Sequence, residues 1–160
     1  MIGAIANQVN SMKLEKEIAS NKFENNYHKT VVNVLYTYGW VTNLLRKRFD
    51  KYHITMQQFN ILRILRGQYP QPATINLLKE RMLDKMSDAS RIVERLVQKG
   101  LVSRCTNEKD RRAVDIKINE KGLELLQKLD MEMNIHEILK SNLTDEEADQ
   151  LNTLLDKMRG

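Results

Sequence analysis

The chain has 160 residues, of which 41% are hydrophobic and 29% charged, a balance typical of a folded globular protein and not of a disordered one. No stretch reaches the roughly 20 apolar residues of a membrane span, and the opening residues lack the basic start of a signal peptide. A single cysteine excludes an internal disulfide, so we expect a cytoplasmic protein.

The net charge of +5 is unevenly distributed. Residues 1–53 carry 8 basic and 4 acidic side chains, residues 54–118 carry 13 and 7, and residues 119–160 carry 5 and 10, which gives segment charges of +4, +6 and −5. Positive charge gathered on the middle segment favours a polyanionic partner such as nucleic acid. Basic surfaces also occur on proteins that have no such partner.

Residues 1–26 are polar and predict an extension that is loose or holds a short helix. A long helix is predicted over residues 27–52, where large apolar residues cover most of the circumference instead of one stripe. Such a helix needs burial on more than one side, and a second subunit would supply it. Tyr36 and Trp40 on this helix could alternatively line a pocket for an aromatic ligand.

Helix starts are predicted at two threonines. Thr55 and Gln58 have the spacing of a capping box, and Thr74 is the expected cap of a supporting helix over residues 75–83. These two helices precede a third, whose sequence has one apolar stripe and one polar face.

The stripe of the third helix is expected to consist of Met86, Ala89, Val93 and Leu96. Asp84 is the expected N-cap, and Gly100 the expected left-handed residue after the C-terminus. The opposite face carries Ser87, Asp88, Arg91, Arg95 and Gln98. Short polar side chains followed by arginines suit a helix that reads base edges and holds phosphates, but a solvated surface helix has the same pattern.

Two strands and two helices follow. Residues 101–106 and 113–118 alternate apolar and polar side chains, which predicts half-buried antiparallel strands joined by a basic turn. Asn119 starts a helix whose apolar stripe is Leu123, Leu126, Leu129, Met133 and Ile138. Thr144 and Glu147 form a second capping box, which starts a helix with Ala148, Leu151, Leu154, Leu155 and Met158.

Three segments of this sequence together resemble the MarR family of winged-helix transcription regulators. They are Ile54–Leu65, Ser90–Val102, and Asp110–Arg112 leading into Ile118–Gly122, and the resemblance extends over residues 27–158. It implies a mainly α fold with a small two- or three-stranded β-wing. It also implies a winged helix-turn-helix DNA-binding lobe over residues 54–118 and a helical dimerisation region made of residues 27–53 and 119–160.

For function, the resemblance implies a homodimer, usually a repressor, that binds a pseudo-palindromic operator in double-stranded DNA and is released by a small aromatic or phenolic ligand. The recognition helix would place at the major groove Ser87, Asp88, Ser90, Arg91 and Arg95. The wing would contribute Arg104, Lys109, Asp110, Arg111 and Arg112. The Asp-x-Arg spacing at its tip would hold the last arginine extended in a narrow minor groove.

The sequence gives no indication of an enzyme, a cofactor or a metal site. The three histidines are scattered, and neither a glycine-rich phosphate loop nor an activated nucleophile is apparent. Cys105 lies beside Arg104, a cation that would favour the thiolate, so a cysteine-based redox response is one alternative. Another is a winged-helix module that binds an acidic protein partner through the same basic face.

Overall fold

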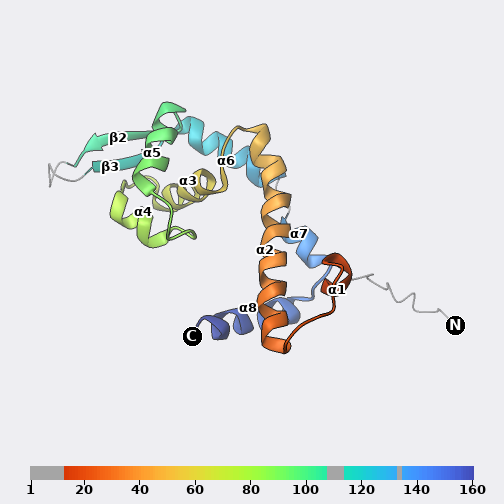
Figure 1. The fold of residues 1–160 in the computed structure, drawn as a ribbon. Helices are drawn as coiled ribbons and strands as arrows, with labels where there is room; N and C mark the ends of the chain where they lie inside the picture. The colour runs from red at the N-terminus through yellow and green to blue at the C-terminus, as the bar shows by residue number, and fades with distance from the viewer. Residues whose placement is uncertain (1–12, 108–113, 133–134) are drawn as a thin grey trace. The chain divides into compact units, whose positions relative to one another are not determined.

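The computed structural model of the protein describes residues 13–107, 114–132 and 135–160 (Figure 1). In chain order the elements are α1 (Leu14–Glu17), α2 (Asn26–Lys51), α3 (Met56–Gln68), β1 (Ala73–Thr74), α4 (Ile75–Arg81), α5 (Ala89–Gln98), β2 (Val102–Thr106), β3 (Val114–Ile118), α6 (Glu120–Glu132), α7 (Ile135–Lys140) and α8 (Asp145–Arg159). The strands form one antiparallel sheet in the order β1-β3-β2. The predicted fold class is confirmed, and the sheet is the three-stranded one of the two alternatives.

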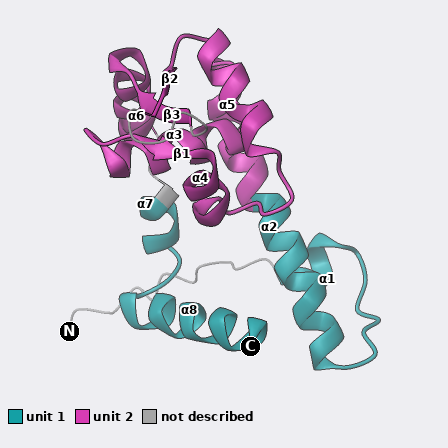
Figure 2. Ribbon diagram, turned by 90° about the vertical axis from the view of Figure 1, so that its left-hand side faces the viewer, with its two compact units in different colours: residues 1–40, 134–160 teal, residues 41–133 magenta. Residues whose placement is uncertain are grey.

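The chain forms two compact units (Figure 2). Unit 1 contains the described residues within 1–40 and 134–160, and unit 2 those within 41–133. The long helix α2 therefore contributes its first part to one unit and its last turns to the other. All elements of the winged helix, from α3 to β3, belong to unit 2.

The core of unit 2 is built on α3. The side chains of Ile61, Leu62 and Leu65 on this helix are at most 1% exposed. The other elements of the unit contribute further buried side chains, which are Leu78, Val93, Leu96, Ile116, Leu126 and Leu129. Each such side chain contributes about 1.5 to 3 kcal/mol when it leaves water, so this apolar cluster is the main stabilisation of the unit.

Both predicted threonine caps in this unit are confirmed. The Thr55 hydroxyl accepts a hydrogen bond from the Gln58 backbone N–H, and the Gln58 side chain accepts one from the Thr55 N–H, which completes the capping box. The Thr74 hydroxyl accepts from the backbone N–H of Leu77. The helix that it starts, α4, ends at Arg81, two residues earlier than predicted.

The predicted start of the third helix was wrong. Helix α5 begins at Ala89, and its N-cap is Asp88, whose carboxylate accepts from the Arg91 N–H three residues on. Asp84 instead closes the preceding turn by accepting from the Met86 N–H and the Ser87 hydroxyl, and these donors hold the pKa of Asp84 below its ordinary value of 3.8.

The predicted set of buried residues on this helix was wrong at one residue. Met86 precedes the helix and is 94% exposed, because the turn that Asp84 closes carries it away from the core. Ala89, Val93 and Leu96 are fully buried, as predicted. Gly100 has φ of +67°, so the expected left-handed residue after the helix is confirmed.

The two predicted wing strands pair in antiparallel register, with Val102 opposite Ile118 and Thr106 opposite Val114. In β3 the expected alternation is confirmed, since Ile116 and Ile118 are buried. In β2 it was wrong, because only its first residue is buried and residues 103–106 are exposed. The reason is position: β2 is the edge strand of the sheet, whereas β3 lies between its two neighbours.

Unit 1 contains α1, the first part of α2, α7 and α8. Glu15 of α1 pairs with Lys29 of α2 at 2.5 Å, and the hydroxyl of Tyr36 donates to the Glu17 carboxylate, so α1 docks on α2 through polar contacts. The Thr144 capping box at the start of α8 is confirmed. The single helix predicted from Asn119 through Ile138 is described as two, α6 and α7, with Met133 outside the described residues.

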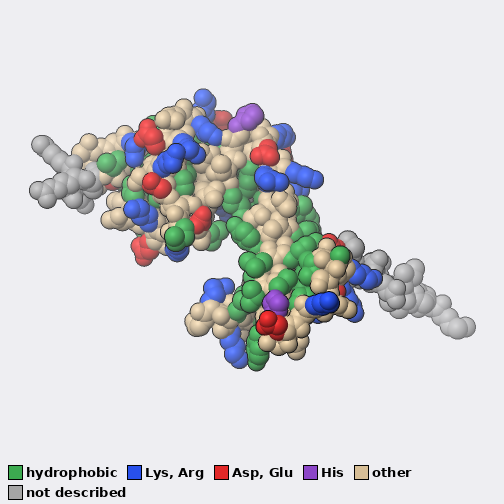
Figure 3. Space-filling view, in the orientation of Figure 1, with side chains coloured by type: hydrophobic (Ala, Val, Ile, Leu, Met, Phe, Trp, Pro, Cys, Tyr) green, Lys and Arg blue, Asp and Glu red, His purple; other side chains and the backbone are tan. Residues whose placement is uncertain are grey.

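The helices of unit 1 expose large apolar side chains. On the first part of α2 they include Tyr27, Val31, Leu35 and Trp40, and on α8 they include Leu151, Leu154 and Met158. No residue of α8 is buried. Hydrophobic side chains run along α2 in Figure 3. An exposed apolar surface of this extent is typical of a protein interface.

Candidate nucleic-acid interface

Helix α5 presents two arginines on its solvent side. Arg91 and Arg95 are four residues apart, one helical turn, and both are exposed, while Val93 between them is fully buried. The helix is short and sharply bounded, since Asp88 caps its start and Gly100 ends it. Its amphipathic sequence therefore fixes which residues reach solvent.

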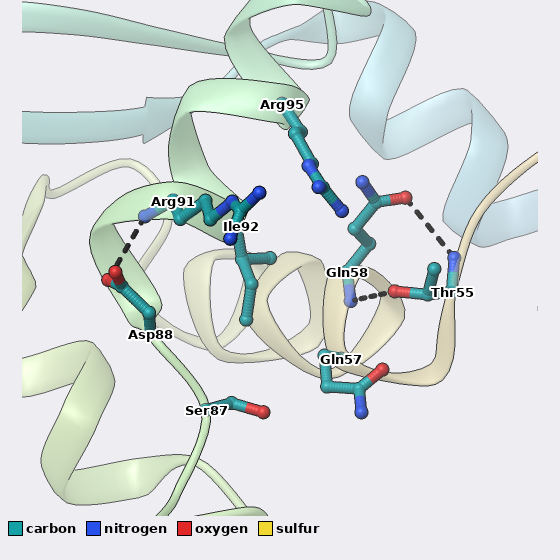
Figure 4. A pocket seen from close by; sticks show the side chains of 8 residues that line it. All are labelled: Thr55, Gln57, Gln58, Ser87, Asp88, Arg91, Ile92 and Arg95. Carbon is teal, nitrogen blue, oxygen red and sulfur yellow. Dashed lines mark hydrogen bonds between the residues drawn. The ribbon is translucent and has the colours of Figure 1, made fainter.

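The arginines line a cavity of about 310 Å³ between α5 and the start of α3 (Figure 4). The α5 side contributes Ser87, Asp88, Arg91, Ile92 and Arg95, and the α3 side contributes Thr55, Gln57 and Gln58. Figure 4 shows the Arg95 side chain extending from α5 toward Gln58. Four of the five predicted recognition-helix residues thus meet at one cavity, and Ser90, which is half-buried, is not among the residues that line it.

The chemistry of this cavity is that of an anion-binding surface with hydrogen-bonding edges. Two guanidinium groups supply forked N–H donors that match a phosphate or a guanine edge. The amide of Gln57 and the hydroxyl of Ser87 can each donate or accept. The one acidic side chain, Asp88, is already engaged by the backbone N–H of Arg91.

Sequence reasoning missed the contribution of α3. Gln57 is the second residue after the Thr55 cap, so it is held in the first turn of α3, where the backbone N–H groups have no partner within the helix. A polar residue beside a capping box was the available signal. That this turn faces α5 depends on packing between residues more than 30 positions apart.

The described part of the wing shows how two predicted residues are held. Arg104 on β2 forms an ion pair of 2.5 Å with Glu94 on α5, which connects the wing to that helix. Cys105 is exposed, with its Sγ 3.9 Å from the backbone oxygen of Asp115. The wing-tip residues predicted to bind DNA lie outside the described residues: Lys109, Asp110, Arg111 and Arg112.

The residues predicted as a ligand pocket lie in unit 1. The hydroxyl of Tyr36 donates to Glu17, and that bond raises the pKa of the phenol above its ordinary value of 10.0. Trp40 is 40% exposed. Within residues 13–107, 114–132 and 135–160, no group of three His, Cys, Asp or Glu side chains could hold a metal ion. None of the helices described there is both long and apolar enough to cross a membrane.

Residues 54–114 match the model of the MarR family. This confirms the resemblance seen in the sequence. No curated protein matches the chain.

Solved structures support the same assignment of the fold. A MarR-like transcription regulator from Bacillus cereus ATCC 10987 is 23% identical with a TM-score of 0.72, over 84% of this chain and 96% of that one. A mutant MarR from E. coli complexed with operator DNA is 25% identical with a TM-score of 0.69, over 92% and 99%. The organohalide-sensing regulator RdhR in a 2,4-dichlorophenol-bound form is 20% identical with a TM-score of 0.72, over 99% and 88%.

Proposed function

Because residues 54–114 match the MarR family model, we propose that this chain is a cytoplasmic, homodimeric repressor that binds a pseudo-palindromic operator in double-stranded DNA. The observation that carries the proposal is the pair of exposed arginines on α5 at one cavity with Gln57 and Ser87. A short helix with this face fits the major groove, about 12 Å wide. The similar MarR from E. coli was crystallised with operator DNA.

In this proposal the two arginines of α5 make different contacts with DNA because they lie at different positions along the helix. Arg91 lies in the first turn of the helix, next to the capped end that enters the groove in helix-turn-helix proteins. Arg95 lies one turn further on, beside the start of α3, where a phosphate can meet both its guanidinium and the unpaired N–H groups of that helix. We therefore assign base contacts to Arg91 and backbone contacts to Arg95, with Ser87, Asp88 and Ser90 at the edge of the same contact.

The wing completes the contact in the proposal. Arg104 is held by Glu94 and would keep β2 in register with the recognition helix. The tip residues Lys109, Asp110, Arg111 and Arg112 are proposed on their sequence alone, with the last of them in the minor groove.

Dimerisation is supported by the exposed apolar side chains of α2 and α8. Leu35 is 65% exposed and Leu154 is 62% exposed in the single chain, although both lie on helices with an apolar pattern. A second copy of the chain would cover them and would also provide the second half-site contact that a palindrome requires.

Release by a small ligand is proposed by analogy with the dichlorophenol-bound regulator, whose fold this chain shares. Tyr36 and Trp40 are the proposed aromatic contacts for such a ligand. A redox response through the exposed Cys105 is the alternative, and oxidation of that thiol would change a strand next to the recognition helix.

The test is binding of the purified chain to the DNA upstream of its own gene, compared with random DNA of equal length at the same salt concentration. We expect binding of the upstream DNA to be at least about a thousandfold tighter. A footprint with two half-sites about 10 base pairs apart would identify the palindrome. Equal, weak binding to both DNAs would reject the proposal and favour an acidic protein as the partner of the basic face.

A further inference from the structure

A large apolar side chain of unit 2 stands in water next to the arginine cavity. Met86 is 94% exposed, and it directly precedes Ser87, which lines that cavity together with Arg91 and Arg95 (Figure 4). Helix α5 begins shortly after it, at Ala89. In helix-turn-helix proteins the N-terminal end of the recognition helix contacts base edges in the major groove. Met86 therefore lies at the end of α5 that we propose to enter the groove.

The exposure of Met86 does not come from a loose turn. The carboxylate of Asp84 accepts hydrogen bonds from the Met86 backbone N–H at 3.0 Å and from the Ser87 hydroxyl at 2.6 Å. The backbone N–H of Leu83 donates to Oδ1 of Asn60 on α3 at 3.0 Å. These bonds hold the turn on both sides of Asp84, so the side chain of Met86 is presented to solvent from a fixed backbone. A contact group that is held in place in this way loses less entropy on binding than one on a mobile loop.

The turn offers little to a phosphate group. The ammonium of Lys85 is engaged, because it donates to the backbone oxygen of Glu80. The carboxylates of Asp84 and Asp88 lie on either side of Met86 in the sequence and would repel a phosphate. Methionine itself has no hydrogen-bond donor and only a weakly accepting sulfur. A contact of Met86 with DNA is therefore expected at a base edge and not at the backbone.

The base edge that suits Met86 is that of thymine. Among the groups that base pairs present in the major groove, the C5-methyl of thymine is the apolar one. The thioether chain of methionine is flexible and polarisable, so it adapts to the shape of an apolar partner. Contact would remove both groups from water, and burial of one methyl group is worth about fourfold in affinity.

We infer that Met86 is a specificity-determining residue, which selects a T·A base pair in each operator half-site by contact with the methyl group of the thymine. This assignment rests on the proposed function. It adds to the hydrogen bonds of Arg91 an apolar contact that carries sequence preference but no attraction for the DNA backbone. Asp84 is a positioning residue for this contact, because its carboxylate fixes the turn that presents Met86.

The test is a scan of the upstream DNA in which each thymine of the bound site is replaced singly by uracil, which lacks only the C5-methyl group. We expect one replacement in each half-site to weaken binding by the natural chain about threefold to fivefold. The same replacement should have no effect on binding by Met86→Ala. Met86→Leu keeps an apolar side chain and should keep the response to uracil.

Methylated cytosine gives an independent measurement at the same position. When the T·A pair is replaced by C·G, methylation of that cytosine at C5 returns the methyl group and leaves the hydrogen-bonding groups of the pair unchanged. We expect this methylation to strengthen binding by the natural chain about threefold to fivefold and to leave binding by Met86→Ala unchanged.

The matched control is Met131→Ala on α6, which removes a methionine that is 72% exposed and does not line the arginine cavity. Its response to uracil should equal that of the natural chain. Asp84→Ala leaves Met86 in place but frees the turn, so it should reduce the response to uracil. Thermal melts should show nearly equal stability for Met86→Ala and the natural chain, because an exposed side chain supports no core.

The possible outcomes separate this inference from the proposed function. A natural chain that binds the upstream DNA specifically but responds to no uracil replacement would overturn the inference and leave the proposed function intact. A response to uracil that persists in Met86→Ala would also overturn it, because the methyl contact would then belong to another residue. A natural chain that binds upstream and random DNA equally would reject the proposed function, and the role of Met86 with it.

Discussion

Gly122 of α6 lies directly against the backbone of Leu101, so that a β-carbon at position 122 would clash with the Leu101 carbonyl oxygen. The same β-carbon would be 2.7 Å from Cγ1 of Ile118. Glycine is therefore required here by close approach of the helix to the wing, and not by its φ. The Asn119 side chain reinforces the junction by donating to the oxygen of Gly100.

We expect Gly122→Ala to lower the free energy of unfolding by about 1 to 3 kcal/mol, because a backbone oxygen cannot move aside as a side chain can. The control is Gly67→Ala on α3, where an added β-carbon meets nothing within 4 Å. It should be neutral or slightly stabilising, since alanine is the better helix former. Urea denaturation of the three chains measures the difference, and equal stability of the two variants would show that the junction adapts.

A second prediction concerns acid. The Glu132 carboxylate accepts from Lys51 Nζ and from the Tyr52 hydroxyl, each at 2.7 Å, and these donors, Lys51 first, hold the pKa of Glu132 below its ordinary value of 4.5. A carboxyl whose pKa is lowered by folding stabilises the protein above its unfolded pKa. That stabilisation is lost as the pH falls through the folded pKa.

Glu132→Gln should therefore lower the melting temperature at neutral pH, and the difference from the natural chain should shrink below about pH 4.5. The effect will be small because the groups are exposed and solvent screens them. Glu124→Gln on the same helix removes an equal charge without a hydrogen bond to these donors and serves as the control. A difference that persists unchanged into acid would mean that Glu132 acts by packing and not by its charge.

The features predicted correctly from sequence are those whose physical cause is local. Thr55 with Gln58 and Thr144 with Glu147 satisfy each other within one turn, so the sequence alone identifies them. Asp84 and Asp88 are both good caps four residues apart, and sequence does not choose between them. The choice depends on where the chain leaves the core, and Met82, which is 2% exposed, is the last anchored side chain before the turn.

The features that were missed depend on packing between distant residues. Gln57 and Arg91 line the same cavity only because α3 and α5 pack together, and Lys99 reaches Gln58 across 41 positions of sequence. Met86 was placed in the core because its spacing continues the apolar stripe, although periodicity carries no information about where a helix begins. The chemical character of individual residues could therefore be predicted from the sequence, whereas the cavity that these residues form together could not.

The third prediction concerns the recognition helix. Arg91→Ala should weaken binding to the upstream DNA by about 1 to 3 kcal/mol and relax the preference at one base position, as expected for a direct base contact. Stability should change by less than about 0.5 kcal/mol, because the side chain is exposed and its backbone N–H keeps the bond to Asp88.

Arg46→Ala, an exposed arginine of α2, removes the same charge away from α5 and is the control for the general effect of charge. Binding to every base variant of the site is measured for both chains by competition. If Arg91→Ala weakened specific and random DNA by the same factor, its contact would be to phosphate.

The last prediction concerns the partner of α8. Leu154 is 62% exposed although the apolar residues of α8 recur at helical spacing, a pattern that is maintained when a face is buried. Leu154→Lys should leave the stability of the isolated chain nearly unchanged, because the position is already in water. It should raise the dissociation constant of the dimer at least about tenfold, since a charge buried in an apolar interface is costly.

Gln150→Lys, an exposed polar position on the same helix, is the matched control. Removing residues 141–160 should have the larger effect. Sedimentation equilibrium over the micromolar range measures all four chains. A Leu154→Lys chain that still sediments as a dimer, or a natural chain that remains a monomer while binding its operator tightly, would show that α8 does not form the subunit contact.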